Sequence, residues 1–217
     1  MLPGPDQIIA CPRCKALASY RTLASGNTIG VRIWTDGKQV APMLPCPPTV
    51  AKCSHCAECF WLADAEDIGT VDYWADEAMR VDPAWTDAQV VREPTEEEYY
   101  EALRKGLAAD ARQERTLRIL AWWRRNDAYR DAPQRESPIA ITSIASRNNL
   151  KVLAALLDEE NENDQLMKAE VLRELGEFGS SQQILERVTS AQYATVVRQL
   201  RSLCDARDGH VRPLQVG

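Results

Sequence analysis

Hydrophobic and polar positions alternate along the first third of the chain and then change to the spacing of helices. Two alternating runs, residues 17–23 and 28–34, flank a cluster of turn-forming residues, and a second turn follows at Asp36 and Gly37. Alternation interrupted by such turns is typical of antiparallel hairpins. We therefore expect short antiparallel strands here, with residues 60–62 as a closing strand.

The helical pattern begins at a capping box, in which Thr95 is the N-cap and Glu98 follows three residues later. Apolar residues then recur at helical spacing as far as Tyr129, which predicts one long helix. Leucines between residues 150 and 157 predict a further helix after a break that contains proline and serine. The second half of the chain is therefore expected to be an α-helical bundle.

Residues 64–94 separate these two parts. They are acidic and contain two prolines, so we interpret them as a linker with one short helix around Asp72–Arg80. The sequence thus predicts the α+β class, with a small β domain at residues 1–63, this linker, and a helical domain at residues 95–217.

Composition describes an ordinary soluble chain of 217 residues, with 45% hydrophobic and 27% charged residues. The N-terminus lacks a basic start followed by an apolar run, and no stretch approaches the ~20 apolar residues that cross a bilayer. A cytoplasmic location is the expectation that follows, with no membrane partner.

Charge bears on the choice of partner. The net charge is −6, and the acidic excess lies in residues 71–217. Phosphate backbones are bound through clustered Lys and Arg, so nucleic acid is a disfavoured partner. Nucleic acid remains an alternative partner because of one basic cluster. Residues 112–130 contain six arginines together with Trp122 and Trp123, a combination that can bind single-stranded nucleic acid. Interleaved acidic residues favour pairing along a solvated helix face instead.

Four of the seven cysteines form two C-x-x-C pairs, which are Cys11 with Cys14 and Cys53 with Cys56. Each pair turns two sulfur atoms toward one point, and two pairs complete a tetrahedron around Zn²⁺ at roughly 2.3 Å per bond. Because no secretion signal is visible, metal ligation is favoured over disulfides. Four thiolates leave no open position for water or substrate, so we predict one structural Zn²⁺ and, with no catalytic constellation visible, no enzymatic activity.

Alternatives to this ligand set remain. Cys59 forms a second C-x-x-C pair with Cys56; we favour Cys53 as the ligand, because Cys59 then begins the strand that leaves the pair. Cys46 and Cys204 are not expected to bind metal. A redox protein resembling rubredoxin would hold iron on the same four cysteines.

The two C-x-x-C pairs, followed by Phe60 and Trp61, resemble the zinc-ribbon family over roughly residues 8–63. The resemblance implies two cysteine knuckles and a small antiparallel sheet around one metal ion. Family members usually place glycine after the second cysteine of each knuckle, where Lys15 and Ala57 stand in this chain.

Residues 164–188 resemble one tetratricopeptide (TPR) helix pair, and residues 190–207 would form the packing helix that follows. A generic helical hairpin remains the alternative. The residues that carry the likeness are Ala169, Leu172, Gly176, Phe178, Ser181, Leu185 and Val188.

The TPR-like resemblance implies binding of other proteins, and the whole architecture is similar to that of uncharacterised bacterial proteins. We therefore expect a non-enzymatic zinc-binding protein that acts as an interaction or adaptor module through its helical domain. The alternative is a nucleic-acid-associated zinc-ribbon protein that uses the Arg-rich helix 112–130.

Overall fold

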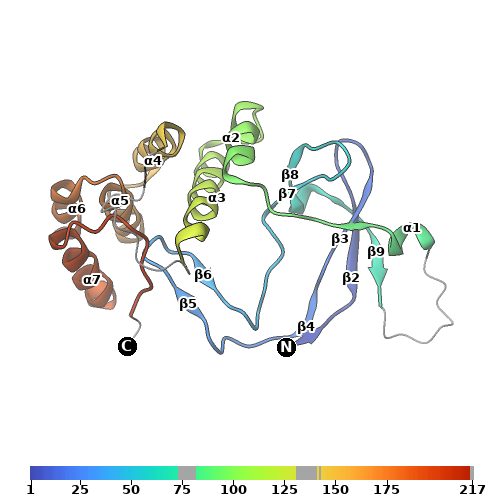
Figure 1. Ribbon diagram of the computed structural model, residues 1–217, viewed down its shortest axis with the longest axis horizontal. Coiled ribbons are helices and arrows are strands. Elements are labelled where there is room, and N and C mark those ends of the chain that lie inside the picture. Colours follow the sequence, from blue (N-terminus) through green and yellow to red (C-terminus); the bar gives the residue numbers. More distant parts are fainter. Residues whose placement is uncertain (73–81, 131–140, 142, 216–217) are drawn as a thin grey trace. The chain divides into compact units, whose positions relative to one another are not determined.

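The computed structural model describes residues 1–72, 82–130, 141 and 143–215, and Figure 1 shows its elements. The chain forms two compact units. The first, which we call the knuckle unit, comprises residues 1–31 and 41–107, and the second, the helical unit, comprises residues 32–40 and 108–217. The chain therefore passes from one unit to the other three times.

A four-stranded sheet in the knuckle unit has the order β10-β3-β2-β9. Its strands are β2 (Asp6–Ala10), β3 (Leu17–Tyr20), β9 (Glu66–Val71) and β10 (Gln89–Val90). The central strand β2 pairs antiparallel with β3 and β9, and β10 runs parallel to β3. The sheet buries Ile8, Ile9 and Ala10 of β2. Consecutive apolar residues of this kind are expected in a strand covered on both faces.

Two strands of this sheet, β9 and β10, come from residues that we expected to form a linker. Between them, the short helix α1 (Pro83–Thr86) begins at Asp82, whose side chain accepts a hydrogen bond from the Ala84 amide. The helix expected around Asp72–Arg80 falls mostly on residues 73–81, outside the described residues. Few residues of β9 are apolar, so its sequence lacks the alternation of apolar and polar positions by which a strand is recognised.

Shorter strand pairs complete the β structure of the knuckle unit. The strand β1 (Leu2–Pro3) pairs with β4 (Leu23–Ser25), and β7 (Val50–Lys52) pairs antiparallel with β8 (Cys59–Trp61). The latter confirms the expected closing strand, although Leu62 already belongs to the 3-10 turn η1 (Leu62–Asp64).

The hairpin expected between residues 17–23 and 28–34 does not form. Instead, β3 pairs with β2, because the turn between them brings residues 7–10 opposite residues 17–20. The second expected turn is present, and Gly37 has a φ of +81° within it. It joins β5 (Arg32–Ile33) to β6 (Gln39–Val40) in an antiparallel hairpin, which belongs to the helical unit.

Thr95 and Glu98 form the predicted capping box at the start of α2 (Glu96–Arg104). The helix ends early, however, and the expected single helix is wrong. Gly106 has a φ of +78°, and its amide binds the Leu103 carbonyl while the Leu107 amide binds that of Ala102. This pair of hydrogen bonds is a Schellman motif, which stops a helix. The next helix, α3, covers Ala111–Arg130.

Helices α3 to α7 build the helical unit. The remaining bounds are α4 (Ile144–Leu156), α5 (Glu162–Glu174), α6 (Phe178–Leu185), η2 (Ala191–Tyr193) and α7 (Ala194–Asp205). One core cluster packs Trp122 of α3 against leucines of α4 and Val171 of α5, and a second packs α5, α6 and α7 around Leu185. None of the helices formed by the described residues is long and apolar enough to span a membrane.

The pair α5 and α6 lies where we expected one TPR-like hairpin. Gly176, with a φ of +84°, follows the C-cap Leu175 and ends α5. The Ser181 hydroxyl of α6 donates to the Ala169 carbonyl of α5 at 2.7 Å, so two small residues allow the two helices to approach closely. The structure therefore contains the predicted helix pair, whereas its kinship with tetratricopeptide repeats stays a prediction.

An isolated antiparallel bridge joins the C-terminal segment to the β5–β6 hairpin. The Thr35 amide binds the Arg212 carbonyl at 2.8 Å, and the Leu214 amide binds the Ile33 carbonyl at 2.7 Å. Trp34, which is buried, lies opposite Pro213. This pairing joins two segments of the helical unit that are far apart in the sequence.

Candidate metal centre

The first knuckle connects β2 to β3. The Cys11 amide donates to the Ala16 carbonyl at 2.9 Å, and the Lys15 amide donates to the Cys11 carbonyl at 3.0 Å. These bonds close a tight turn, in which Lys15 has a φ of +58°. Residues other than glycine rarely adopt this left-handed conformation, because Cβ approaches the backbone.

The second knuckle, between β7 and β8, repeats the same pattern. The Cys53 amide donates to the Glu58 carbonyl at 2.9 Å, and the Ala57 amide donates to the Cys53 carbonyl at 3.0 Å. Ala57 has a φ of +59°. The two positions where the zinc-ribbon family usually has glycine are thus the two that need a left-handed backbone, so the chain forms both turns at a conformational cost.

The four predicted ligands come together. The Sγ atoms of Cys11, Cys14, Cys53 and Cys56 all lie within 4.8 Å of one another. The Cys14 and Cys53 sulfurs are 3.7 Å apart, and the Cys11 and Cys56 sulfurs are 3.9 Å apart. A tetrahedron with metal–sulfur bonds of 2.3 Å has edges of about 3.8 Å. The cluster therefore fits one tetrahedral metal ion.

Cys59 does not belong to this cluster. It begins β8, and its sulfur lies 4.0 Å from the Glu98 carbonyl oxygen. Within the described part of the chain, the four cysteines are the one group of three or more Cys, His, Asp or Glu residues close enough to hold a metal. The structure therefore favours Cys53 over Cys59, as the sequence analysis expected.

The remaining sulfur and imidazole groups lie elsewhere. Cys46 is exposed, while Cys204 is buried in α7 and its thiol contacts the Ser181 hydroxyl at 3.4 Å. His55 is exposed within the second knuckle, whereas His210 is buried near the C-terminus. None of these four residues extends the four-cysteine cluster.

The cluster is buried on one side and partly exposed on the other. Cys11 and Cys53 are buried among Ile9, Ala51 and Phe60, and Cys14 and Cys56 are partly exposed. Burial raises the pKa of the Cys11 thiol above its ordinary value. Burial is also the largest single effect on Cys53, but hydrogen bonds from the backbone amides of Cys56 and His55, together with those of the Cys56 and Cys14 thiols, lower its pKa to about 7. Amides that point at sulfur favour the thiolate, which is the form that binds metal.

The Arg-rich helix is engaged in ion pairs. Arg115 of α3 pairs with Asp164, and Arg118 pairs with Glu114 at 2.6 Å. Arg130 binds Asp36 of the hairpin at 2.6 Å in a buried ion pair. The Arg118–Glu114 pair is the expected pairing along the helix, whereas Arg115 and Arg130 pair with acidic residues of other segments, and the Arg130 pair is buried.

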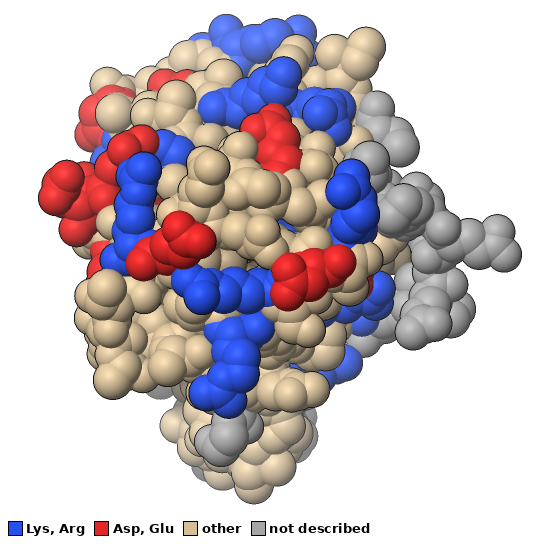
Figure 2. Space-filling view, turned by 90° about the vertical axis from the view of Figure 1, so that its left-hand side faces the viewer, with Lys and Arg blue, Asp and Glu red and all other residues tan. Residues whose placement is uncertain are grey.

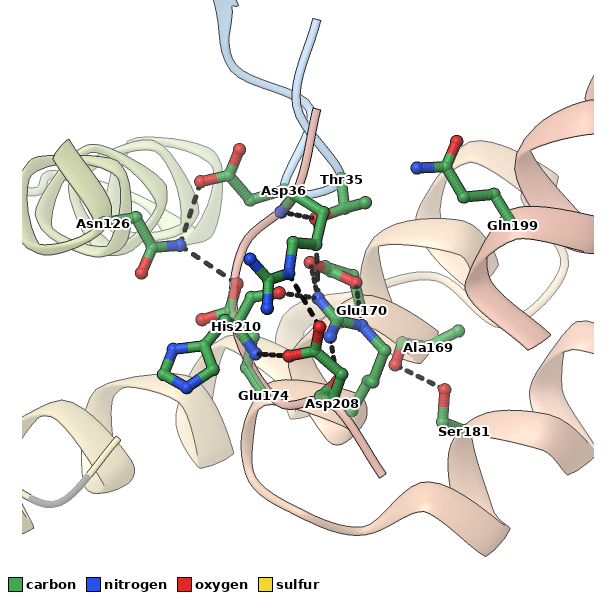
Figure 3. Close-up of polar contacts among 12 residues, drawn as sticks. Thr35, Asp36, Asn126, Ala169, Glu170, Glu174, Ser181, Gln199, Asp208 and His210 are labelled. Atoms are coloured by element: carbon green, nitrogen blue, oxygen red, sulfur yellow. Dashed lines mark hydrogen bonds and ion pairs between the residues drawn. The ribbon is translucent and has the colours of Figure 1, made fainter. Parts of the chain in front are cut away.

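A buried polar network in the helical unit was not predicted from the sequence. Figure 3 shows how the hairpin, α3 and α5 each contribute one member of its centre. The Asn126 amide donates to Asp36 and to Glu174, at 3.0 Å each, and the Trp122 indole donates to Glu174 at 2.9 Å. Nearby, Arg173 pairs with Glu170 and also donates to the His210 carbonyl at 2.8 Å.

This network explains why the hairpin belongs to the helical unit. Asp36, Asn126, Glu170, Arg173 and Glu174 each expose 3% or less of their surface. Buried polar groups are costly unless they are paired, so their mutual contacts fix one arrangement of the segments that carry them. The one sequence signal was Asp36 in a D-G turn, which indicated the turn alone.

No protein-family model matches this chain, and no curated protein or solved structure is significantly similar to it. The case for a metal centre therefore rests on the residues themselves. Two knuckles with the same hydrogen bonds place four sulfur atoms at the spacing that a tetrahedral ion requires. The chain thus contains a four-cysteine cluster that can hold one metal ion.

Proposed function

We propose that one Zn²⁺ ion, bound by Cys11, Cys14, Cys53 and Cys56, closes the knuckle unit, and that the chain is a non-enzymatic protein-binding module. The observation that carries this proposal is the closed set of four sulfur ligands. Such a set leaves no coordination position for water or substrate, so the metal would have a structural role. Zinc is the usual ion in tetrahedral four-thiolate sites, and iron is the alternative.

Zinc would join the two halves of the knuckle unit. The first knuckle extends the four-stranded sheet, while the second connects the separate β7–β8 pair. Metal binding supplies folding free energy to small domains of this kind. The β7–β8 pair also packs Ala51 and Phe60 against Ile9 and Ala18 of the sheet, so removing the ion would leave this apolar contact as its main attachment and would destabilise the pair.

The helical unit offers the surface that we propose for the partner protein. Ile144 and Val152 of α4 expose 78% and 39% of their surface and are spaced so that both lie on one side of the helix. Ala145 and Ala155 are also exposed on this helix, and Lys151 is its exposed cation. Exposed apolar side chains grouped in this way are typical of protein-binding surfaces. We call this surface the α4 face.

Nucleic acid remains the alternative partner, but the ion pairs of Arg115, Arg118 and Arg130 weigh against it. On the face drawn in Figure 2, Lys and Arg are spread over the surface with Asp and Glu between several of them. A phosphate backbone is bound best by an unbroken basic stripe.

A pull-down at moderate salt tests the proposal, with the wild-type chain and the double variant Ile144→Ser/Val152→Ser as bait. The matched control is Ile29→Ser, because Ile29 is 74% exposed but belongs to the knuckle unit. We expect a protein that the wild type and the control capture and the α4 variant does not. Capture of no protein, or equal capture by all three baits, would contradict the proposed role of the α4 face. Salt-sensitive binding of nucleic acid would favour the alternative.

A further inference from the structure

The strand β8 has one unpaired edge. Its pairing with β7 is fixed at the two ends of the ladder, where the Leu62 amide binds the Thr49 carbonyl and the Cys53 amide binds the Glu58 carbonyl. Hydrogen-bonded and non-hydrogen-bonded positions alternate in an antiparallel pair. Phe60 therefore directs its N–H and C=O toward β7, whereas Cys59 and Trp61 direct theirs away from it.

Among the described residues, no backbone partner is found for the N–H and C=O groups of Cys59 and Trp61. The outer edge of β7 differs, because the Lys52 amide binds the Arg92 carbonyl at 3.0 Å there. The β7–β8 pair thus has one covered edge and one open edge. An open edge presents a row of donors and acceptors to which another strand can pair.

A cavity of about 400 Å³ lies along this open edge. All three residues of β8 line it, and no residue of β7 does, so it lies on the unpaired side of the strand. The opposite walls are the first knuckle, at residues 11–13, and the end of α2 with the turn that follows it, at Ala102 and residues 105–107. The Trp61 indole donates to the Leu107 carbonyl at 3.1 Å and connects β8 to the second of these walls. Pockets of roughly 300–1,000 Å³ are typical of ligand sites.

The lining limits which ligand fits. Pro12, Phe60, Ala102 and Leu107 supply apolar surface. The charges on the rim balance: Glu58 lies 3.0 Å from both Arg13 and Lys105, and the other lining carboxylate is Asp64. Because the rim has no excess of positive charge, it is not suited to a polyanion. The spacing of the unpaired N–H and C=O groups of Cys59 and Trp61 suits an extended peptide backbone instead.

We propose that the cavity binds an extended peptide segment of a partner protein, which adds a strand to β8 and places an apolar side chain between Phe60, Ala102 and Leu107. A second copy of the chain fits less well, because its own β8 is equally enclosed between a knuckle and α2. This site goes beyond the proposed α4 face and lies in the other unit. It depends on the metal insofar as the ion holds both knuckles, because β8 begins at the second knuckle and the first knuckle forms one wall of the cavity.

Selection of phage-displayed random heptapeptides on the immobilised, metal-loaded chain tests this site. A selected peptide is then synthesised, and the exchange of backbone amide hydrogens is followed by NMR. We expect the peptide to slow exchange at Cys59 and Trp61 at least tenfold and to leave Phe60, which already pairs with β7, unchanged. Failure to select any peptide, or a bound peptide that leaves Cys59 and Trp61 unprotected, would overturn the proposal.

Proline at position 61 gives a second test. Trp61 has a φ of −66°, which is the value that proline imposes, and its N–H points away from β7. Trp61→Pro therefore removes the open donor without breaking the β7–β8 ladder, and Trp61→Ala controls for loss of the indole. We expect Trp61→Pro to bind the selected peptide at least tenfold more weakly than Trp61→Ala, with the metal content of both equal to that of the wild type. Equal binding by the two variants would refute strand addition.

The peptide site at β8 and the α4 face can be tested independently of each other. The variant Ile144→Ser/Val152→Ser should bind the selected peptide as the wild type does, because α4 belongs to the helical unit. Loss of peptide binding in that variant would contradict the assignment of the peptide site to β8 and would leave the α4 face as the binding surface.

Discussion

The carboxyl group of Glu174 should make the stability of the helical unit depend on pH. It is fully buried on α5 and accepts hydrogen bonds from Trp122 and Asn126. Its pKa is raised from 4.5 to about 8; burial is the largest cause, the nearby carboxylates of Glu170 and Asp36 also raise the pKa, and Arg173 and the Trp122 indole oppose them. The folded chain therefore keeps a proton on Glu174 at neutral pH, which the unfolded chain has released.

Proton linkage determines whether the unfolding free energy rises or falls with pH. Between pH 4.5 and about 8, the folded state binds one proton more than the unfolded state, so unfolding becomes easier as the pH rises. The stabilisation is complete below pH 4.5 and is lost as the pH rises through about 8. The expected slope is a little over 1 kcal/mol per pH unit, which amounts to about 4–5 kcal/mol over the whole window.

The variant Glu174→Gln removes the titrating group and keeps its shape. It should be less stable than the wild type at pH 5 by about 1–3 kcal/mol, because its NH₂ group meets the Asn126 donor. Its unfolding free energy should then change less with pH than that of the wild type. Urea titrations of both proteins from pH 5 to 9 measure the difference in slope.

The indole signal of Trp122 provides a local check, because its N–H donates to Glu174 at 2.9 Å. Its NMR chemical shift should titrate with a midpoint near 8 in the wild type and stay constant in Glu174→Gln. Parallel stability curves for the two proteins, together with an indole signal that does not titrate, would refute the reasoning about this buried carboxyl.

Two further predictions concern the knuckle unit and a helix end. Glu98 binds Lys52 and Arg92, and its hydrogen bond with Arg92 is the main cause that holds its pKa far below the ordinary value of 4.5. Glu98→Gln should therefore lower the unfolding free energy by about 1–3 kcal/mol at pH 7. The difference between the two proteins should shrink as the pH falls below 4.5, where Glu98 begins to lose this stabilisation. Chemical denaturation at pH 7 and pH 3 measures both differences, and equal differences would contradict the stabilising role of the Glu98 carboxylate. Ala57→Gly should raise the stability of the metal-loaded chain by up to about 1 kcal/mol, because glycine relieves the left-handed backbone at a φ of +59°. Arg207→Gly, at a φ of +52° after α7, is the matched case in the helical unit, and a loss of thermal stability in both variants would argue against strain at these positions.

The candidate metal site was predictable because its information is local. Each knuckle is a turn of six residues, and both its ligands and its closing hydrogen bonds lie within those residues. The sequence also showed where glycine was missing, and the structure shows that Lys15 and Ala57 adopt the glycine-like conformation. The capping box of Thr95 and Glu98 was a local signal of the same kind, and it is confirmed.

What the sequence could not predict depends on contacts between distant residues. The strand β9 carries polar residues and becomes a strand only by pairing with β2, about 60 residues earlier. Likewise, the β5–β6 hairpin belongs to the helical unit because Asp36 pairs with Arg130. The end of α2 was a local signal that the apolar spacing concealed, since Gly106 marks a helix stop within an otherwise continuous pattern.

The central proposal is that one Zn²⁺ ion on four cysteines closes the knuckle unit. Native mass spectrometry of the chain purified without added metal, alongside Cys53→Ser and Cys59→Ser, tests it most directly. The account predicts one zinc per chain in the wild type and in Cys59→Ser, and loss of the zinc in Cys53→Ser. Zinc retained by Cys53→Ser but lost from Cys59→Ser, bound iron, or a wild-type chain without metal would contradict it.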